Sequence, residues 1–564
     1  MTPPDLIRHV RFPLSVLTLA VLTTLSANAA PLVPDAGQTS RELEKSAQPE
    51  QPKAVAPLRI EGADAATPTG DGAVHFLVTG FHISGNSIVD SNTLAALLDD
   101  LAGHRLSLRE LNTGVARITS WYRQHGYAIA RAYLPAQDIK DGIVEVRILE
   151  GRLDQQRIDN RSGLSDQRAR AYLDGIHNGD ILVTQDVDRA LMLLNDTPGV
   201  GGARATLQPG ASVGTSDLVV ELTPGRPYAG SVDLDNYGNR YTGQYRLGSS
   251  LAINSPLGIG DQISVRALTS VDQLDYVRFA YQVPLGASGL RLGAAYSDTR
   301  YRLGKEFSSL QAGGNVAGGS LFVVYPLIRS QRGNLSATLS WEHKHLVDKT
   351  DTPQSNITKD VNLVALGLSG NRQDSLGGAG NTSFEVNLAS GHLNMDALSE
   401  TLDQASAQTD NQFARLSYNL SRLQRVSDNN NLYLAVAGQE ASKNLNSSEK
   451  FSLGGANGVR AYPQGEASGD RGWLANLEWR YRFRPNLQAV IFYDAGSVDF
   501  NRNPFTTASN RRTLSGGGIG LDALLEKWQF KTYLAWPFSG GAPTSEPADA
   551  THSPRLWALA SYSF

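Results

Sequence analysis

The stretch Gly454–Gly472, GGANGVRAYPQGEASGDRG, lies between two segments that have the pattern of β-strands. The segment before it is Leu432–Gln439, and in the segment after it, Trp473–Phe483, apolar residues alternate with polar ones. Alternation with a period of two predicts a strand with one apolar face and one face in water. The next strand carries Asp494 in register with these polar residues. A glycine-rich loop that carries Arg460, beside a strand with one inward carboxylate, indicates that the loop folds inside a hollow structure.

The loop contains a motif that is similar to the VRGY signature of the two-partner secretion transporters of the TpsB type. It consists of Val459, Arg460, Ala461 and Tyr462. These transporters are outer-membrane barrels that export one large partner protein, and the segment around Asp494 and Gly496 resembles their strand motif. The resemblance implies that Arg460 reaches into the lumen and pairs with Asp494. Ala461 stands where the family has Gly, which weakens any argument for a positive φ there. The loop alone leaves an alternative open, an ordinary external loop with a solvent-exposed arginine.

The composition limits the class of protein. The chain has 564 residues, enough for several domains, and its net charge of −4 predicts no general attraction to nucleic acid. It has no cysteine, so we expect neither a disulfide framework nor thiol chemistry. Apart from the N-terminus, no segment is apolar for long enough to predict a membrane helix. The strands of a membrane barrel alternate and give no continuous apolar run, so a barrel stays possible.

Residues 1–29 have the pattern of a secretory signal peptide. Arg8 and Arg11 form a positive region, Phe12–Leu25 is apolar, and Ala27–Ala29 offers a cleavage site between small residues. A membrane anchor is the alternative, but the apolar run is short for one. We therefore expect the mature chain to leave the cytoplasm.

Residues 30–72 form a proline-rich linker in which Gln38–Ala47 predicts a short helix. An isolated helix of this length is marginal in water, so it needs a docking site. The resemblance to the TpsB transporters implies that this helix plugs the barrel lumen. A disordered tail is the alternative.

Residues 73–151 and 152–226 show the same order of predicted elements, β-α-α-β-β, which is an internal repeat. In the first unit we expect strands at Val74–Gly85, Ile129–Leu134 and Ile143–Leu149 and helices around Leu94–Leu101 and Leu111–Tyr122. In the second we expect strands at Asp154–Asp159, Ala203–Leu207 and Asp217–Leu222 and helices at Asp166–Ile176 and around Val187–Leu194. The repeat resembles the POTRA domain, and Leu134–Asp138 and Leu194–Gly199 resemble its TpsB form. Without the resemblance, these are two small α+β domains that an enzyme would equally use.

A sheet edge in such a domain accepts an extended peptide as an added strand. Main-chain hydrogen bonds then supply affinity, and pockets for alternate side chains supply specificity. This mode of binding suits an unfolded client. The sequence leaves open which edge and which domain the client uses.

From residue 227 to residue 564 helical spacing nearly disappears, and the chain reads as sixteen strands of about ten residues, the length of a membrane strand. The expected strands are 228–238, 243–254, 261–271, 274–284, 289–299, 318–327, 334–346, 357–371, 381–392, 411–421, 430–440, 473–483, 486–496, 512–522, 528–537 and 554–564. Tight turns alternate with connections that we expect to be long, at 300–317, 347–356, 393–410, 441–472, 497–511 and 538–553. This rhythm is typical of an outer-membrane barrel and not of a soluble sandwich.

The polar faces of these strands predict a charged inner wall, which a water-filled lumen tolerates. The expected inward charges are Arg246, Glu342, Glu478, Arg480, Arg482 and Asp494. The last strand carries Tyr562 and Phe564 on its apolar face. An aromatic C-terminal residue on an alternating strand resembles the signal that the barrel-assembly machinery reads. A chain that merely ends at Phe is the alternative.

No motif for catalysis or nucleotide binding is present. The sequence contains no G-x-x-x-x-G-K-[ST] loop, G-x-S-x-G elbow or H-E-x-x-H helix. His343 and His345 share a strand face and are spaced to touch a metal, but we expect them to be exposed at a strand end. We therefore expect no enzyme, no cofactor and no metal.

The combined features predict a membrane all-β barrel of sixteen antiparallel strands behind two POTRA-like domains and a plug helix. We expect an outer-membrane transporter of a Gram-negative bacterium, with periplasmic POTRA domains that recognise an unfolded exoprotein and a pore that secretes it without ATP. Its expected partners are a TpsA-type adhesin, haemolysin or toxin, outer-membrane lipid and the barrel-assembly machinery. The alternatives are an outer-membrane assembly factor of the same superfamily, a passive porin, and a surface enzyme exported through its own barrel.

Overall fold

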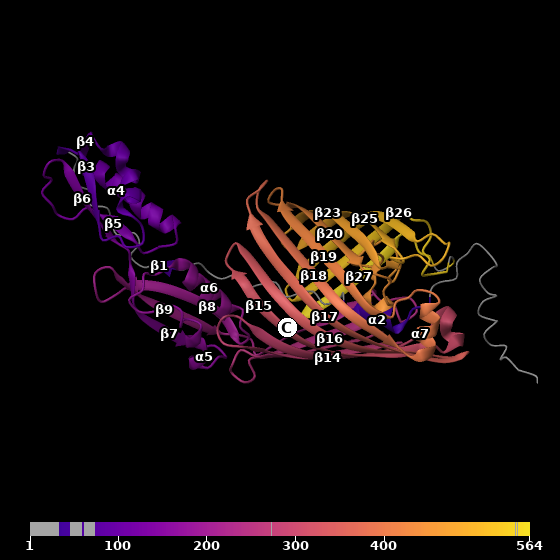
Figure 1. The fold of residues 1–564 in the computed structure, drawn as a ribbon. Coiled ribbons are helices and arrows are strands. Elements are labelled where there is room, and N and C mark those ends of the chain that lie inside the picture. Colours follow the sequence, from indigo (N-terminus) through magenta and orange to yellow (C-terminus); the bar gives the residue numbers. More distant parts are fainter. Residues whose placement is uncertain (1–32, 45–58, 61–73, 272, 548, 550) are drawn as a thin grey trace, which may run out of the picture.

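The computed structural model describes residues 33–44, 59–60, 74–271, 273–547, 549 and 551–564. Two small α+β domains precede a large closed barrel, and a short helix, α2, lies within the barrel (Figure 1). The predicted signal peptide, residues 1–29, lies outside the described residues. In the described part of the chain, no helix has the length and apolar character needed to cross a membrane.

The first α+β domain packs two helical segments against a three-stranded sheet of order β3-β6-β5. Its elements are β2 (His75–Leu77), β3 (Gly80–Ser84), α3 (Ser91–Ala95), the 3₁₀ helix η1 (Ala96–Leu101), β4 (Arg105–Ser107), α4 (Leu108–Gln124), β5 (Arg131–Tyr133) and β6 (Ile143–Leu149). Helix α4 begins at a capping box in which the side chains of Ser107 and Glu110 bond to each other's backbone N–H. Its apolar stripe, which includes Val115 and Ile118, faces the core.

The prediction of one strand over Val74–Gly85 is wrong, because the chain changes partner within it. Strand β2 pairs with β4, which the sequence did not predict, whereas β3 pairs in parallel with β6. Between them Val78 is fully buried, and its N–H donates to the carbonyl of His104 at 3.0 Å. The two pairings therefore form separate small sheets within one domain.

The second α+β domain repeats the predicted order of elements. They are β7 (Arg152–Asn160), α5 (Asp166–Ala171), α6 (Thr184–Asn195), β8 (Val200–Pro209) and β9 (Thr215–Pro224). Helix α5 ends before the predicted Ile176, because tighter turns replace the α-helix after Ala171. A strand from the linker, β1 (Arg59–Ile60), adds to this sheet, whose order is β1-β8-β9-β7.

The second domain is bound firmly to the barrel by the segment that follows α6. The two carboxylate oxygens of Asp196 accept hydrogen bonds from Arg329 Nε at 2.6 Å and Nη2 at 2.9 Å. The Asp196 carbonyl also accepts from Arg291 Nη2 at 2.7 Å. At Gly289, in a barrel turn, an added Cβ would lie 2.7 Å from Leu193 Cδ2, so the surfaces touch closely. These contacts set the orientation of the domain at the barrel end.

The barrel consists of sixteen consecutive antiparallel strands and is closed by pairing of β10 with β27, as predicted. Its strands are β10 (Tyr228–Asp235), β11 (Arg246–Asn254), β12 (Gln262–Thr269), β13 (Leu274–Pro284), β14 (Arg291–Arg302), β15 (Gly313–Arg329), β16 (Gly333–Asp351), β17 (Gln354–Asp374), β18 (Gly380–Met395), β19 (Asn411–Arg425), β20 (Asn430–Ala441), β23 (Arg471–Arg484), β24 (Leu487–Asp499), β25 (Arg511–Leu525), β26 (Trp528–Ser539) and β27 (Arg555–Ser563). The loops also contain η2 (Lys305–Leu310), α7 (Ala397–Gln404), η3 (Ser447–Glu449), β21 (Phe451–Ser452) and β22 (Ser468–Gly469).

Two details of the predicted barrel are wrong. Strands β15 to β18 are 16 to 21 residues long instead of the 10 to 15 residues of the predicted bounds, because they continue past the apolar belt. The expected long connection at 347–356 is a tight turn at Thr352–Pro353, since β16 and β17 stay paired up to Asp351 and Gln354. Polar residues there had suggested a loop, but a strand outside the membrane has no need of an apolar face.

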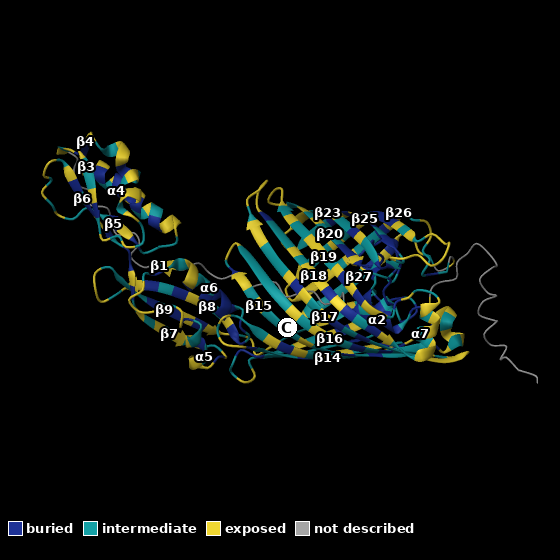
Figure 2. Cartoon of the chain, in the orientation of Figure 1, coloured by how far each residue is buried: buried dark blue, intermediate teal, exposed yellow. Residues whose placement is uncertain are grey.

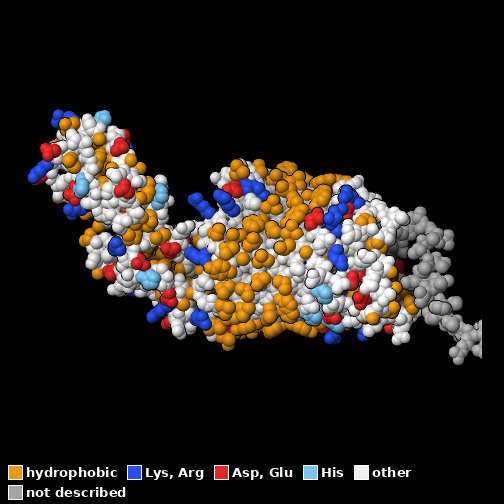
Figure 3. All heavy atoms as spheres, viewed as in Figure 1, with side chains coloured by type: hydrophobic (Ala, Val, Ile, Leu, Met, Phe, Trp, Pro, Cys, Tyr) orange, Lys and Arg blue, Asp and Glu red, His pale blue; other side chains and the backbone are white. Residues whose placement is uncertain are grey.

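The two faces of the barrel wall differ as a membrane barrel requires. On the face of the barrel seen in Figure 3, apolar side chains form a broad band between ends that carry charged side chains. Trp341, Trp479 and Leu339 are examples of large exposed apolar residues on it. Buried residues gather around α2, inside the barrel (Figure 2). The inner wall combines buried charged residues, such as Lys344 and Asp494, with an apolar cluster that receives α2, and the loop between β20 and β23 also lies against it.

Candidate functional site

The plug helix α2 (Ala36–Glu44) begins at Asp35, whose Oδ1 accepts the N–H of Gln38 at 2.8 Å. Ala36 and Leu43 are buried in one apolar cluster with residues of the barrel wall. The helix starts two residues before the predicted Gln38, and the last three predicted residues lie outside the described part. Because a nine-residue helix is unstable alone, the lumen supplies its stability.

Polar contacts hold α2 against the wall at both of its ends. The Ala36 N–H donates to Asp348 Oδ1 at 2.8 Å. At the other end, the ammonium of Lys344 lies 2.8 Å from Glu44 Oε1. Lys344 is almost fully buried, and it also lies 3.4 Å from Glu449 Oε1. Glu449 is in η3, so the plug and the lumen loop share one lysine.

The plug helix also touches the lumen loop directly. Ser447 Oγ donates to Asp35 Oδ2 at 2.7 Å. A Cβ added at Gly37 would lie 2.2 Å from Ser447 Oγ and 2.5 Å from the Ser448 nitrogen. Any side chain at Gly37 would clash with η3, so only glycine lets the helix lie this close to the loop. Because of this close contact, a shift of α2 disturbs the packing of η3.

Arg460 lies at the centre of the lumen loop and is paired with the wall. Its Nη2 is 2.8 Å from Asp494 Oδ1, and its Nε and backbone N–H donate to Asp494 Oδ2 at 2.9 and 3.1 Å. Arg460 is 4% exposed and Asp494 0%, so the pair is shielded from bulk water. Its Nη1 contacts Glu478 Oε1 at 2.8 Å. The loop arginine therefore binds two carboxylates from adjacent strands, β23 and β24.

Aromatic residues complete the surroundings of the guanidinium group. It lies over the ring of Phe492 at 3.6 Å and near that of Tyr533 at 5.1 Å. The indole N–H of Trp557 donates to the Arg460 carbonyl at 2.7 Å. Asn476 donates to Asp494 Oδ1 at 2.8 Å and so fixes the carboxylate. Arg460 at the loop tip is therefore held by β23 and β24 through Glu478 and Asp494, and by β27 through Trp557.

The other residues of the predicted motif pack the loop onto the wall. Val459 and Tyr462 are fully buried, and the Tyr462 hydroxyl donates to the carbonyls of Ser539 and Gly541 at 2.8 and 3.0 Å. Ala461 is not among the residues with a positive φ. A Cβ added at Gly516 would lie 2.4 Å from the Ala461 methyl group, so a glycine on β25 makes room for this alanine.

Gly496, which follows Asp494 in the predicted strand motif, likewise makes room for the lumen loop, here on β24. A Cβ there would lie 2.7 Å from Leu453 Cδ2, and its φ is not positive. The glycine is therefore needed for close approach of the loop and not for its own backbone conformation.

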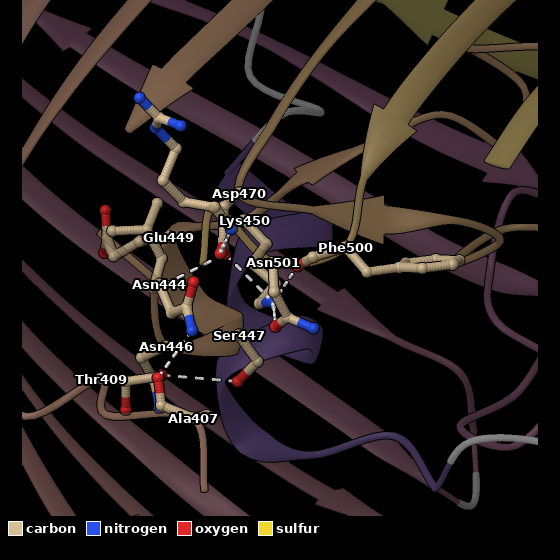
Figure 4. A network of polar contacts seen from close by, with 12 residues as sticks. Ala407, Thr409, Asn444, Asn446, Ser447, Glu449, Lys450, Asp470, Phe500 and Asn501 are labelled. Atoms are coloured by element: carbon tan, nitrogen blue, oxygen red, sulfur yellow. Dashed lines mark hydrogen bonds and ion pairs between the residues drawn. The ribbon is translucent and has the colours of Figure 1, made fainter. Parts of the chain in front are cut away.

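A second polar network fixes the base of the lumen loop to neighbouring loops (Figure 4). Asp470 is fully buried, lies 3.1 Å from Lys450 Nζ and accepts the N–H of Arg502 at 2.7 Å. Lys450 Nζ donates in turn to the Phe500 carbonyl at 2.6 Å. Asn444 Nδ2 donates to the carbonyl of Ala407, in the loop with α7, at 2.7 Å. In Figure 4, α2 passes directly beside this base, next to Ser447.

The sequence analysis identified Arg460 and Asp494 but missed several of their partners. Glu478 and Asn476 were placed on the polar face of the correct strand, yet nothing in that pattern assigned them to Arg460. Phe492 and Trp557 belong to inward faces and carry no local signal. Glu466, fully buried with Arg512 at 2.7 Å, was likewise not singled out.

The C-terminal aromatic residues lie at the seam where the barrel closes. The Phe564 N–H donates to the Gly230 carbonyl at 3.0 Å, and a Cβ at Gly230 would lie 2.5 Å from the Phe564 ring. Tyr562 packs against Trp528, with ring centroids 5.0 Å apart. The Phe564 contacts join the last strand to the first, whereas Tyr562 packs on the neighbouring strand β26.

His343 and His345 do not lie at a strand end, because β16 continues to Asp351. His345 Nδ1 is 2.8 Å from Asp360 Oδ1, and His343 Nδ1 is 3.0 Å from Asn362 Oδ1. Among the described residues, no group of three or more His, Cys, Asp or Glu side chains is arranged to hold a metal ion.

A closed sixteen-stranded barrel with an apolar belt, two α+β domains at one end and a filled polar lumen defines an outer-membrane transporter. The family model of the haemolysin secretion/activation protein ShlB/FhaC/HecB matches residues 214–523, and the model of the ShlB-type POTRA domain matches residues 76–151. The chain therefore belongs to the ShlB/FhaC/HecB family, and it is an outer-membrane transporter of the TpsB type with periplasmic POTRA domains. The predicted family, fold class and location are confirmed.

Individual relatives agree with this assignment. The heme/hemopexin transporter protein HuxB of Haemophilus influenzae (strain 86-028NP) is 28% identical over 501 residues, which are 86% of this chain and 88% of that protein. The outer membrane transporter CdiB of Dickeya dadantii is 26% identical over 461 residues, 77% of each chain. The solved structure of CdiB from Escherichia coli has the same fold, with a TM-score of 0.70 and 22% identity over 90% of this chain and 94% of that one.

Proposed function

We propose that this chain recognises one large, unfolded exoprotein in the periplasm through its POTRA domains and secretes it through the barrel without ATP. The observation that carries the proposal is the filled lumen: a helix and a loop, each held by specific contacts, occupy the space that a polypeptide would cross. A passive porin has no use for a blocked channel. The sequence motifs for nucleotide binding are absent, and folding of the client outside supplies a direction because it prevents return.

The partner belongs to the class of large secreted TpsA-type proteins, an adhesin, haemolysin or toxin. One relative, the hemolysin transporter protein ShlB of Serratia marcescens, is named for a protein cargo, and another, HuxB, is named a heme/hemopexin transporter, so the relatives differ in what they transport. An assembly factor of the same superfamily is the second candidate. The plug helix favours secretion, because it is docked on the same loop that carries Arg460.

Within this function we assign roles to the predicted residues. Arg460 and Asp494 hold the lumen loop in its working position, while Val459, Ala461, Tyr462 and Gly496 let it pack on the wall. Transport requires α2 to leave and the loop to shift. Tyr562 and Phe564 serve as the signal for the barrel-assembly machinery, and the outer belt contacts outer-membrane lipid.

The domain limits that we propose follow the same division. They are a signal peptide at 1–29, plug helix and linker at 30–72, POTRA domains at 73–151 and 152–226, and the barrel at 227–564 with the lumen loop at 441–472.

Deletion of this chain tests the proposed function. We expect one large polypeptide to disappear from the medium or the cell surface and to return when the chain is supplied again. The assembly-factor alternative predicts a different outcome, a general loss of barrel proteins from the outer membrane. Unchanged secreted and surface proteins after deletion would refute the proposal.

A further inference from the structure

We propose that loops at the outer end of the barrel form a binding site for a short carbohydrate chain. The site is a cavity of about 450 Å³ between three segments, residues 404–410, 443–444 and 503–505. Its volume lies in the range of about 300–1,000 Å³ that is usual for small-ligand sites. The first segment begins at the last residue of α7, which lies at the barrel end away from the two POTRA domains (Figure 1). Because those domains are periplasmic, the cavity lies on the cell surface, where polysaccharides are abundant.

One buried asparagine joins the walls of the cavity. Asn444, at the base of the lumen loop, is 3% exposed. Its Nδ2 donates to the carbonyls of Ala407 at 2.7 Å and Asn503 at 2.9 Å, and the contact with Ala407 is drawn in Figure 4. Its Oδ1 accepts the N–H of Asn503 at 2.7 Å. The two walls are therefore held together before a ligand enters, and a preformed site loses less entropy on binding.

The wall that follows α7 is fixed through its main chain. The N–H groups of Thr409 and Asp410 donate to Asp403 Oδ2 at 2.6 and 3.0 Å. The Asp410 carbonyl accepts from Lys443 Nζ, in the second segment. With these main-chain groups already paired, Gln408 and Asp410 line the cavity with an amide and a carboxylate.

The opposite wall presents an amide and an aromatic ring. The main chain of Asn503 is held by Asn444, whereas its side-chain amide forms no hydrogen bond within the described part of the chain. Phe505 also lines the cavity and is 46% exposed. A sugar ring suits this pair, because its C–H face packs on an aromatic ring while its hydroxyl groups both donate and accept hydrogen bonds.

The remaining chemistry of the lining separates a sugar from other ligands. Seven of the ten described residues that line the cavity are polar, so an apolar ligand does not fit. Lys443 alone among these ten is basic, and its ammonium already donates to a carbonyl, so a phosphate group lacks the charged partners it needs. Amide side chains offer a donor and an acceptor each, as a sugar hydroxyl requires. A neutral or amide-bearing oligosaccharide is the class that fits.

A segment of the exported protein is the other possible occupant. An extended peptide binds chiefly by main-chain hydrogen bonds to the edge of a sheet. The cavity is instead lined by residues of loops, whose main-chain groups are largely paired with each other and with Asn444. The lining therefore favours a ligand that is bound through side chains.

Binding to an array of immobilised probes tests the proposal. The full chain is applied in a detergent without a sugar head group and is detected with an antibody. The array carries core oligosaccharides released from lipopolysaccharide by mild acid, mammalian glycans, and unglycosylated peptides. We expect retention on oligosaccharides and not on the peptides. Retention on the lipopolysaccharide sugars assigns the ligand to the cell's own outer leaflet, and retention on the mammalian glycans assigns it to another cell.

Two variants of the cavity and two matched controls sharpen the test. Phe505→Ala should weaken oligosaccharide binding about tenfold and Asn503→Ala about fivefold, since they remove the stacking ring and the unpaired amide. Leu402→Ala and Thr507→Ala are the controls, because these side chains are exposed on the same two loops but do not line the cavity. All four changes affect surface side chains, so we expect the unfolding temperature of the wild type in each.

Three results would overturn the inference. They are retention on no oligosaccharide, equal retention on the peptides, and wild-type binding by both cavity variants. The proposed function fails separately, because the inference concerns the outer loops and does not rest on it. If deletion of the chain changes no secreted protein while the array retains it, export is wrong and the carbohydrate site stands.

Discussion

Replacement of Asp494 by Ala removes the main anchor of the lumen loop. Asp494 accepts three hydrogen bonds from Arg460, at 2.8, 2.9 and 3.1 Å, and both residues are buried. Breaking a buried ion pair by removing one partner costs about 3–5 kcal/mol. Because Arg460 keeps Glu478 at 2.8 Å, we take the lower value, about 3 kcal/mol, which corresponds to a rise of about 100-fold in the fraction of molecules with a displaced loop. Asp494→Asn retains one acceptor oxygen and should fall between Ala and the wild type.

The arginine itself reports the displacement, since trypsin cleaves after Arg460 only when the loop has left the lumen. The cleavage rate of purified protein in detergent tracks the population of the displaced state when closing is fast. Glu385→Gln is the matched control, because Glu385 is an inward carboxylate whose hydrogen bond is to Asn387 on its own strand. Equal trypsin cleavage at Arg460 in Asp494→Ala and in the wild type would contradict the role of the pair. In cells, normal secretion by a charge-reversed Asp494→Arg variant would show that export does not need it.

Three further changes test other contacts. Tyr462→Phe removes the one hydroxyl proton that the carbonyls of Ser539 and Gly541 share, and it should raise trypsin cleavage of the same loop about fivefold, equivalent to about 1 kcal/mol; no change would mean that packing alone holds the ring. Arg329→Ala leaves Asp196 without its ionic partner, so amide exchange in the second POTRA domain should become faster, whereas unchanged exchange would exclude this docking contact. In the first domain, burial raises the pKa of Glu150, but hydrogen bonds from Ser87 and from backbone N–H groups outweigh it and lower the pKa overall. Glu150 therefore stabilises the domain above its unfolded pKa of about 4.3, and this contribution disappears as the pH falls through the lower folded pKa. Glu150→Gln should destabilise the domain at pH 7 by about 1–3 kcal/mol, with the difference from wild type shrinking in acid; a constant difference measured by amide exchange would refute this.

The sixteen strands were predictable because the membrane imposes both a length and an alternation on each of them. The same constraint explains where the prediction was wrong. Strands β16 and β17 extend past the apolar belt, where no periodicity is required, so the turn at Thr352–Pro353 looked like part of a long loop. Strand β4 has three residues and pairs only with β2, too short a segment for any pattern to mark it.

The site was predictable only in part, and for a related reason. The resemblance pointed to Arg460 and Asp494, and the alternation of Trp473–Phe483 placed Glu478 on the inner face. Phe492 and Trp557 reach Arg460 because the barrel closes and brings β24 and β27 around the same loop. Such neighbours depend on tertiary structure, and local sequence carries no information on them.

The charges around the plug determine which part of the lumen opens most easily. Three carboxylates and three basic groups meet at Lys344. Helix α2 contributes one of each to this cluster, Arg41 and Glu44, which lie 3.6 Å apart. When the helix leaves, Lys344 keeps Glu342 at 3.6 Å and Glu449 at 3.4 Å. Because Arg415 lies 3.0 Å from Glu449, the remaining cluster has two carboxylates and two basic groups and carries no net charge.

The lumen loop has no such balance. Withdrawal of Arg460 takes one positive charge from Asp494 and Glu478, of which only Glu478 has another basic partner, Arg480, at 2.7 Å. Asp494 would be left with Asn476 as its hydrogen-bond donor. Since an unpaired buried carboxylate costs several kcal/mol until water reaches it, displacement of the loop is more costly than departure of the helix. The helix should therefore leave first. Its exit lets water reach Asp494, and hydration of this carboxylate lowers the free-energy cost of moving the loop.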